Sequence, residues 1–277
     1  MSDKIKESYR QSKNIYDDVL TQSKWWSRLY IKLFWGGVDD NDIAKEVLKY
    51  IPDDFAGKLL DVPVGTAVFT YRKYAEMKYA DIACLDYSMD MLEQAKEKFE
   101  ECGIENITVM QGDVGDLPFS DENFDIVLSM NGFHAFPDKQ KAYEETERVL
   151  KQGGKFITCF YIRGRSKITD LLVGRILAKK GWFTPPFDTV SSLKERLELK
   201  YRIKNFHVRG SMVWFCAVKK GMVRNCKSGV MTKRQEKSMN EMYSLWEIAV
   251  AILITVGIAM FCSTVKIICR KMIKNMN

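Results

Sequence analysis

Residues 59–70 read LLDVPVGTAVFT. Two apolar residues lead into Asp61, and a turn of small residues with Gly65 at its centre follows at once. A buried parallel strand ends in this way where the next loop wraps closely around a nucleotide-like ligand. Because Gly65 has no Cβ, its backbone can approach a ligand and adopt angles closed to other residues. The stretch predicts a ligand-binding turn at the end of a strand.

Apolar, β-rich runs alternate with helical runs on both sides of this turn. We expect strands at 57–62, 81–86, 106–110, 124–130 and 154–161, and helices at 43–50, 68–78, 89–102 and 138–150. Gly153-Gly154 is interpreted as the stop of the last of these helices and a turn before the fifth strand. The alternation predicts a mostly parallel sheet that is covered by helices on both faces.

The pattern of residues 167–219 predicts that the last strands of the sheet are antiparallel, unlike those before them. Two helical stretches within 167–199 are separated by the sequence GWFTPPFDT. The segments 201–208 and 211–219 then have the pattern of a hairpin that turns at Arg209-Gly210. The sheet should therefore close with an antiparallel edge.

Composition and charge limit the possible partners. The chain has 277 residues, of which 46% are apolar, so it can fold as one sizeable core with an appendage. Its net charge of +7 is concentrated in residues 219–237, which hold one acid, Glu236, among many Lys and Arg. Such a stretch suits nucleic acid or a membrane surface. The adjacent sequence favours the membrane, and no nucleic-acid partner is expected.

Residues 248–265 carry no charged side chain. As a helix they would be about 27 Å long, close to the hydrocarbon thickness of a bilayer. Tyr243 and Trp246 precede this run, and Lys266, Arg270, Lys271 and Lys274 follow it, as at membrane interfaces. A buried core helix is the alternative. We expect a single-pass C-terminal membrane anchor; basic residues flank both of its ends, and the start of the chain has no signal-peptide pattern.

Cysteine and histidine usage bears on redox state and metals. None of the seven cysteines forms a C-x-x-C pair, which favours free thiols in a reducing compartment. With only His134 and His207 present, no metal site is expected. His207 has the pattern of an edge-strand residue with a structural role.

Polar residues follow four successive strands of the predicted sheet. Asp61 and Asp86 end the first and second strands, and Asp113 follows the third. Residues 131–134 lie just past the fourth. Ligands of open α/β sheets bind outside the carboxyl ends of the strands, where an acid after the second strand accepts bonds from ribose hydroxyls. These residues should therefore face one ligand. Ordinary helix-cap or turn aspartates are the alternative, and Asp125 is interpreted as a loop or strand-start residue rather than a catalyst.

Five motifs in order carry a family resemblance: LLDVPVGTA, DYSMDML, GDVGDLPF, FDIVLSMNGFHAF and RVLKQGGKF. Over residues 40–160 the chain resembles class I S-adenosylmethionine-dependent methyltransferases, in particular the ubiquinone/menaquinone-biosynthesis-like subgroup. The resemblance implies an α/β fold with a Rossmann-like, doubly wound, mostly parallel seven-stranded sheet and an antiparallel edge hairpin, to which the C-terminal transmembrane helix is added. A dinucleotide dehydrogenase would need G-x-G-x-x-G, which the turn lacks.

The resemblance also implies S-adenosyl-L-methionine as the cofactor and a set of residues that bind it. Asp61 and Gly65 would lie beside its methionine portion, with Val62 in the same set. Asp86 would hold the ribose hydroxyls, Tyr87 and Met91 would lie near the adenine, Asp113 with Val114 would recognise the adenine ring, and Asn131 would border the sulfonium.

The turn departs from the family pattern D-x-G-x-G-x-G at two positions. Pro63 replaces the first glycine, which removes one N–H and stiffens the loop. Ala67 replaces the last glycine and adds a methyl group where packing is tight. Because Gly65 is in place, we expect cofactor binding to be retained.

His134 is the candidate catalytic residue. It is either a general base for a hydroxyl or thiol nucleophile or a packing residue above the cofactor. Methyl transfer from a sulfonium is an in-line displacement that depends mainly on alignment and exclusion of water, so an acid–base pair is optional.

Two aromatic segments outside the common core bear on the acceptor. Residues 25–35 read WWSRLYIKLFW and form either a lid, a membrane-dipping helix or a core helix. Residues 181–188 read GWFTPPFD and are a second candidate lid. With the anchor, they predict a small lipophilic acceptor (a quinone, lipid, phenol or thiol) and contact with membrane lipids.

The domain division predicted from these patterns runs as follows: 1–40 N-terminal helical cap or lid, 41–221 methyltransferase domain, 222–243 basic juxtamembrane linker, 244–268 transmembrane helix, 269–277 basic tail. The leading hypothesis is an enzyme that methylates a lipophilic acceptor at a membrane, with the catalytic domain on the cytoplasmic side. A membrane-tethered, non-catalytic cofactor-binding protein is the alternative. A nucleic-acid or protein methyltransferase fits less well.

Overall fold

The computed structural model describes residues 40–221. The chain divides into two compact units, Met1–Met222 and Val223–Asn277, and all described residues belong to the first. Predictions for the aromatic segment 25–35, the basic linker, the transmembrane helix and the tail lie outside the described residues. None of the helices among residues 40–221 combines the length and the hydropathy that a membrane span requires.

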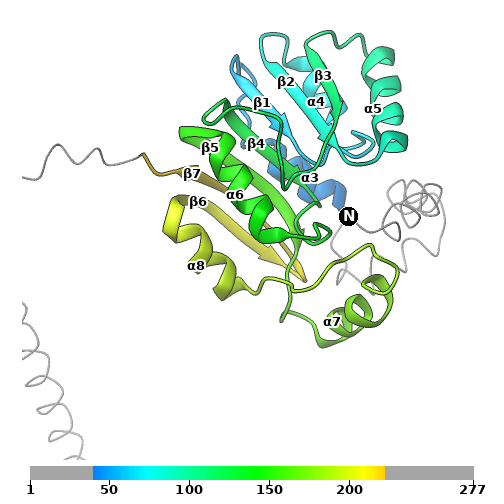
Figure 1. Ribbon diagram of the computed structural model, residues 1–277, viewed down its shortest axis with the longest axis vertical. Helices are drawn as coiled ribbons and strands as arrows, with labels where there is room; N and C mark the ends of the chain where they lie inside the picture. Colours follow the sequence, from blue (N-terminus) through cyan, green and yellow to red (C-terminus); the bar gives the residue numbers. More distant parts are fainter. Residues whose placement is uncertain (1–39, 222–277) are drawn as a thin grey trace, which may run out of the picture. The chain divides into compact units, whose positions relative to one another are not determined.

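Helices and strands alternate through the first two thirds of the described residues (Figure 1). Their bounds are α3 (Asp40–Leu48), β1 (Lys58–Asp61), α4 (Tyr71–Glu76), β2 (Asp81–Asp86), α5 (Met89–Glu101), β3 (Ile107–Gln111), β4 (Phe124–Met130), α6 (Lys139–Val149) and β5 (Leu150–Tyr161). A second series follows: α7 (Lys167–Leu172), the π-helical turn η1 (Val173–Leu177), α8 (Val190–Lys200), β6 (Tyr201–Arg209) and β7 (Met212–Lys219).

The strands form one seven-stranded sheet in the order β3-β2-β1-β4-β5-β7-β6. The first five strands are parallel, and β7 pairs antiparallel with both β5 and β6. The Rossmann-like α/β sheet with an antiparallel edge hairpin is therefore confirmed. Because the order reverses direction at β1, the carboxyl ends of β1 and its neighbours β2 and β4 form the edge where such sheets bind ligands.

Helices cover both faces of the sheet, and each face has its own apolar core. One core takes residues from α3, α4 and α5, and the other takes residues from α6 and α8. Alternate residues of one strand feed the two cores: Ile126 and Leu128 of β4 face the first, and Val127 between them faces the second. This period of two is what a strand buried on both faces requires.

The prediction for Gly153-Gly154 was wrong. α6 ends at Val149, and β5 begins at Leu150 and runs through both glycines. Leu150 pairs with Phe124 of β4 before the register shifts, and Gly153 has φ +76 at this irregularity. The glycines therefore serve a bulge inside a strand, where a positive φ is needed, and not a helix stop.

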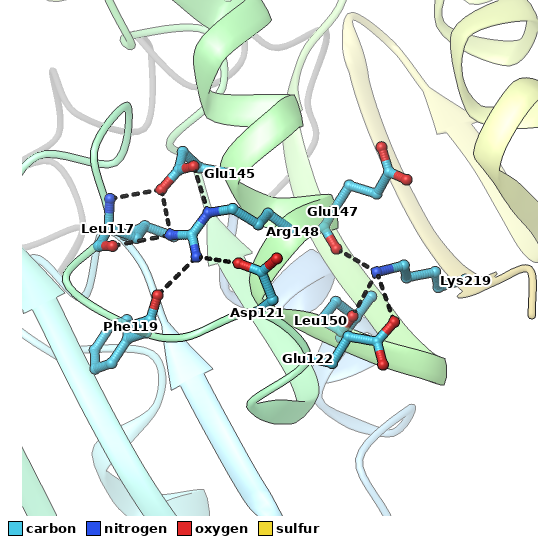
Figure 2. A network of polar contacts seen from close by, with 9 residues as sticks. All are labelled: Leu117, Phe119, Asp121, Glu122, Glu145, Glu147, Arg148, Leu150 and Lys219. Carbon is cyan, nitrogen blue, oxygen red and sulfur yellow. Dashed lines mark hydrogen bonds and ion pairs between the residues drawn. The ribbon is translucent and has the colours of Figure 1, made fainter. Parts of the chain in front are cut away.

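Arg148 ties the connection between β3 and β4 to α6 (Figure 2). Its guanidinium binds both carboxylate oxygens of Glu145 at 2.7 Å and donates to the carbonyls of Leu117 and Phe119. Asp121 accepts a further bond at 2.9 Å. The hydrogen bond from Arg148 is the main reason that the pKa of Glu145 lies below its usual value. The fork of Arg148 thus holds a loop that has no regular structure of its own.

Lys219 closes the adjacent end of α6 (Figure 2). Its buried ammonium donates to the carbonyls of Glu147 and Leu150, at 2.7 and 2.8 Å. Carbonyls at a helix C-terminus lack intrahelical partners and favour a nearby cation. Lys219 ends β7, so this contact fixes the antiparallel hairpin to the helix that covers the parallel strands.

Candidate functional site

Asp61 ends β1 as a buried carboxylate, 1% exposed. The hydroxyl of Tyr74 donates to its Oδ2 at 2.8 Å, whereas Oδ1 has no hydrogen-bond partner among residues 40–221. Burial, with a smaller contribution from the nearby charge of Asp86, raises the pKa of Asp61 to about 7, and the hydrogen bond from Tyr74 opposes part of this rise. A buried carboxylate with one unsatisfied oxygen is ready to accept a donor or a cation from a ligand.

The turn after β1 is held against the end of β2. Val64 N–H donates to the carbonyl of Leu85 at 3.0 Å, and Gly65 N–H donates to Asp86 Oδ2 at 2.8 Å. Gly65 has φ +57, and a Cβ built on it would find no atom within 4 Å. The backbone angle therefore favours glycine, and its side-chain position opens onto free space.

Asp86 joins two elements at the edge of the sheet. Besides Gly65, its carboxylate accepts from Ser88 N–H, at 2.9 Å on Oδ1. Ser88 caps α5 by accepting from Met91 N–H at 3.4 Å, so Met91 is buried in the first turn behind the carboxylate. Burial raises the pKa of Asp86, and the backbone bonds offset part of that rise. The segment containing Tyr87 is thereby fixed beside the glycine turn.

The loop after β3 lies next to Asp86. Gly112 N–H donates to the Asp86 carbonyl at 3.0 Å, and Gln111 donates to the Tyr87 carbonyl at 3.0 Å. Asp113 follows and bends its own loop by accepting from Gly115 N–H at 2.8 Å, and Val114 is buried. The predicted adenine residues are thus held next to the predicted ribose residue.

The turn after β4 approaches the glycine turn from the other side. Asn131 has φ +54, and its N–H donates to the Cys159 carbonyl at 2.8 Å. A Cβ on Gly132 would lie 2.4 Å from Pro63 Cδ and 2.8 Å from Ser129 Oγ. Pro63, one of the two departures from the family pattern, is thus packed directly against a glycine.

Ala67, the other departure, has a backbone angle that glycine adopts more readily than alanine. It has φ +56 and is buried. An L-residue in the left-handed region costs about 1 kcal/mol or more. The turn therefore carries a local strain at Ala67, whose carbonyl accepts the N–H groups of Thr70 and Tyr71 at the start of α4.

His134 is buried behind this edge, 4% exposed. Its Nδ1 accepts from Tyr161 N–H at 3.2 Å, and its ring stacks on Phe183 with centroids 4.1 Å apart. Burial lowers the pKa of His134 to about 3. With Nδ1 engaged as an acceptor, the neutral ring carries its proton on Nε2. This geometry favours packing, the second of the two alternatives for His134, over a general base.

The segment 181–188 closes over His134 from the region between η1 and α8. Thr184 N–H donates to the His134 carbonyl at 2.9 Å, and its hydroxyl donates to the Ala135 carbonyl at 2.9 Å. Lys139 donates to the carbonyl of Thr184 and lies over the Phe187 ring. Aromatic edges of Phe183 and Phe187 meet Tyr161 at the end of β5. An aromatic wall thus borders the carboxyl end of the sheet.

Comparison with known proteins agrees with this arrangement. A protein-family model described as "Methyltransferase domain" matches residues 54–180. An uncharacterised chloroplastic methyltransferase of Arabidopsis thaliana is 32% identical over 143 residues, 50% of this chain and 40% of the relative. A demethylmenaquinone methyltransferase of Bacillus cytotoxicus is 36% identical over 114 residues, 41% of this chain and 48% of the relative. The solved structure of an S-adenosylmethionine-dependent methyltransferase from Aquifex aeolicus has a TM-score of 0.51 at 18% identity, covering 72% of this chain and 96% of that one.

The chain carries a class I S-adenosylmethionine-dependent methyltransferase domain. The domain is of the ubiquinone/menaquinone-like type, so the predicted family is confirmed. The matches span less than half the length of the two curated relatives, 40% and 48%. The likeness to the Aquifex aeolicus structure bears on the fold alone, because its identity is 18%.

The edge of the methyltransferase domain fits S-adenosylmethionine. Asp61 Oδ1 is buried without a partner among the described residues, and the pKa of its carboxyl is raised by burial and by Asp86. The cofactor brings an ammonium and a sulfonium. Their positive charges would favour the ionised form of Asp61 and so lower its pKa, and the ammonium could donate to its unpartnered oxygen. The space beside Gly65 is where a Cβ would stand, so a ligand can lie against the bare backbone. The cofactor assignments for Asp61, Val62, Gly65, Asp86, Tyr87, Met91, Asp113, Val114 and Asn131 remain predictions.

Sequence reasoning missed three residues that shape the site of the methyltransferase domain. Tyr74 donates to Asp61 from α4, Gln111 fixes Tyr87, and Gly132 makes room for Pro63. Gly132 could have been found from the sequence, since it follows Asn131 in FDIVLSMNGFHAF. Tyr74 had none, because only the fold brings it back to Asp61.

Two other polar residues of the methyltransferase domain lie apart from this site. Asp125 starts β4 at the opposite end of the sheet, where it accepts from Lys151 at 2.8 Å and from Lys58 N–H. His207 is on the edge strand β6 and stacks on Trp214 with centroids 5.3 Å apart. Among residues 40–221, Cys84, Cys102, Cys159 and Cys216 are free thiols, and no cluster of three metal-ligating side chains is present.

Proposed function

We propose that this chain transfers the methyl group of S-adenosylmethionine to a small lipophilic acceptor, such as a quinone, lipid, phenol or thiol, at a membrane surface. The observation that carries the proposal is the meeting of Asp61, Gly65 and Asp86 at the carboxyl edge of a methyltransferase sheet. The demethylmenaquinone methyltransferase relatives support a quinone-like acceptor. The catalytic domain would lie on the cytoplasmic side.

The chain would contribute positioning and a dry environment. The bound cofactor supplies an electrophilic methyl group on a sulfonium. Asp61 would hold the cationic end through its free oxygen, and Asp86 would hold the sugar. Tyr161, Phe183 and Phe187 would exclude water from the side on which a lipophilic acceptor approaches.

The state of His134 has a consequence for the acceptor. Its Nε2 carries a proton, and burial disfavours the charged ring, so His134 does not take a proton from the acceptor. The acceptor would therefore arrive with an ionised or easily ionised oxygen, sulfur or carbon. Hydroquinones, phenols and thiols meet this requirement better than aliphatic alcohols.

Incubation of the full chain with methyl-labelled S-adenosylmethionine and a cell lipid extract tests the proposal. We expect the label to move into a lipid-soluble product, and more slowly or not at all into water-soluble alcohols. The Asp61→Ala and Asp86→Ala variants should lose the transfer. Transfer to nucleic acid or protein instead of the lipid extract would contradict the proposed acceptor class.

A non-catalytic, membrane-tethered cofactor-binding protein is the second candidate. It is favoured by Pro63 and by the strained Ala67, since both alter the loop that meets the cofactor. Calorimetric binding of S-adenosylmethionine, measured on the protein used in the transfer assay, separates the two. Binding with no labelled product from any lipid pool would support this second candidate.

A further inference from the structure

The segment between β5 and the aromatic wall exposes aliphatic side chains. Ile168 and Leu171 of α7 are 67% and 50% exposed, and Ile176 of η1 is 43% exposed. The other large exposed apolar residues in the described part of the chain, Tyr79, Met89 and Leu199, are scattered over other elements. Scattered apolar residues are ordinary, but a group on one short helical segment marks an interaction surface.

The opposite side of the same segment explains why it is ordered. Thr169, Val173 and Leu177 are buried at a spacing of four residues, and the last two belong to the core. Ile168 and Leu171 are three residues apart, which places them on one helix face. Ile176 follows Leu171 by five residues, one turn of the π-helical part. The segment is thus amphipathic with two apolar stripes, of which one is buried in the core of residues 40–221 and the other is exposed.

Basic residues surround the exposed stripe. Arg163, Arg165, Lys167, Arg175, Lys179 and Lys180 are all exposed. The one acid in this segment, Asp170, has both oxygens engaged, since it accepts from Tyr161 hydroxyl at 2.6 Å and from Gly164 N–H at 2.9 Å. The outward charge of residues 163–180 is therefore positive.

We propose that residues 163–180 form a docking surface for an anionic phospholipid bilayer. Ile168, Leu171 and Ile176 enter the boundary between headgroups and acyl chains, and the surrounding Lys and Arg side chains meet the lipid phosphates. Exposed aliphatic side chains within a basic surround are the composition of helices that lie in a membrane interface. Nucleic acid would use the cations and leave the aliphatic side chains in water.

A feature of the chain outside the described residues also favours a bilayer. Residues 248–265 carry no charge and are predicted to span a membrane, so the domain would be held within reach of lipid headgroups. A basic stretch, 219–237, precedes that run and would add to the attraction for anionic lipids.

The surface adjoins the cofactor edge of the sheet. Asp170 binds Tyr161, the last residue of β5, and α7 follows β5 in the chain (Figure 1). The chain then returns to the site through Phe183, which stacks on His134. Docking would therefore bring the edge of the sheet to the bilayer and let an acceptor pass from lipid to the site. This purpose rests on the proposed function, whereas the docking itself does not.

Amide hydrogen exchange on the full chain tests the proposal. The chain is reconstituted with vesicles of phosphatidylcholine alone or with about a third phosphatidylglycerol, without any methyl donor. We expect exchange of residues 163–180 to slow several-fold on the anionic vesicles, and this protection to fall in high salt. Because no methyl transfer is measured, failure here is distinct from failure of the proposed function.

Variants identify the side chains responsible. Ile168→Ser with Leu171→Ser and Ile176→Ser, or Lys167→Glu with Arg175→Glu and Lys179→Glu, should abolish the protection. All six side chains are exposed, so the fold should persist. A matched variant with Lys78→Glu, Lys96→Glu and Lys204→Glu reverses as many exposed charges on other elements and should keep the protection.

Three outcomes would overturn the proposal. Equal exchange of residues 163–180 on neutral and anionic vesicles would show that lipid charge does not recruit this surface. The same protection in uncharged detergent micelles would show that this surface does not need anionic lipid headgroups. Protection that grows with the protein-to-lipid ratio would assign the surface to a second copy of the chain.

Discussion

Two buried carboxylates, Asp61 and Asp86, dominate the electrostatics of the site. Both have raised pKa values because burial disfavours their charged forms, and the charge of Asp86 adds to the rise at Asp61. The domain without cofactor therefore contains a local instability that a cation would remove. Stability, pH and ligand binding should be linked through these two residues.

Asp61 makes a specific prediction for pH dependence. Its pKa in the folded domain is about 7, above the value of about 3.9 in an unfolded chain. The stability that it contributes is fully present below pH 4 and is lost as the pH rises through 7. Between pH 5 and 8 the unfolding temperature of the natural protein should fall as the pH rises, and in Asp61→Asn it should fall much less. S-adenosylmethionine should raise the unfolding temperature of the natural protein most above pH 7.

Tyr74→Phe provides the control for this prediction. Removing the hydroxyl that donates to Asp61 withdraws a bond that favours the charged carboxylate. The pKa of Asp61 should rise, and the decline in stability should move to higher pH. Identical pH profiles for all three proteins would mean that Asp61 is not the titrating group.

Gly65→Ala separates backbone strain from cofactor contact. At φ +57 the substitution should cost about 1 kcal/mol of unfolding free energy. No protein atom lies within 4 Å of the new methyl group, so the methyl group should interfere with the bound ligand rather than with the protein. Calorimetry should show at least tenfold weaker binding of S-adenosylmethionine.

Gly103→Ala is the matched control, because Gly103 has φ +63 and equally open surroundings after α5. It should cost similar stability in chemical denaturation. Its affinity for S-adenosylmethionine should equal that of the natural protein. Equal loss of binding in both variants would show that strain, not contact, is responsible.

His134→Asn tests the packing role of His134. The amide oxygen of asparagine can replace Nδ1 as acceptor for Tyr161 N–H but cannot act as a base. We expect kcat/KM to stay within a few-fold and the pH profile to keep its shape. A general base would instead show a loss of about 10²–10⁴-fold. His134→Ala should destabilise the domain by about 3 kcal/mol, because the stack on Phe183 is lost.

At the scale of elements, the site depends on loops that are fixed from the far end of the sheet. The β3–β4 connection begins with Asp113 and Val114 beside Asp86 and continues to the segment 117–121, which Arg148 holds. A shift of this connection where Arg148 holds it would thus also move Asp113 and Val114 at the cofactor edge. Stability and cofactor affinity should change together when this tie is cut.

Arg148→Ala should lower the unfolding free energy by about 2 kcal/mol, since it removes hydrogen bonds from a charged donor to three acceptor groups of one loop. Cofactor affinity should fall as well. Arg148→Lys keeps the positive charge but loses the planar set of donors, so its unfolding free energy should lie between those of Arg148→Ala and the natural protein. Urea denaturation and calorimetry measure the two effects; a lysine variant equal to the natural protein would show that charge alone suffices.

At the scale of the whole molecule, the chain divides at Met222 into two units. Deletion of residues 240–277 should leave the unfolding temperature and cofactor affinity of the described domain unchanged. Methyl transfer to an acceptor dissolved in vesicles should fall, whereas transfer to a water-soluble analogue should persist. Unchanged activity on the membrane-dissolved acceptor would count against a role for the C-terminal segment.

The sequence predicted most of the sheet because buried strands and amphipathic helices have different hydrophobic periods. The bounds of β2 and β4 agree with those expected, and the hairpin was found at the correct place. Gly153-Gly154 was misinterpreted, because a glycine pair stops a helix or serves a bulge, and only the pairing of Leu150 with Phe124 decides which.

The site was predictable where its residues end strands and not where the fold returns a side chain from elsewhere. Asp61, Asp86 and the turn at Gly65 were expected to meet, and they do. Tyr74 reaches Asp61 from a helix, and the state of His134 depends on Tyr161 and Phe183. Such contacts depend on three-dimensional packing, which periodicity along the chain does not encode.

The contact between Pro63 and Gly132 constrains how this loop can change over evolution. A Cβ at position 132 would stand 2.4 Å from Pro63 Cδ, so the proline is tolerated only where position 132 is already glycine. The reverse does not hold, because glycine at 132 is also compatible with glycine at 63. Proline at 63 and a larger residue at 132 would therefore clash, so the two positions would have to change together in this loop.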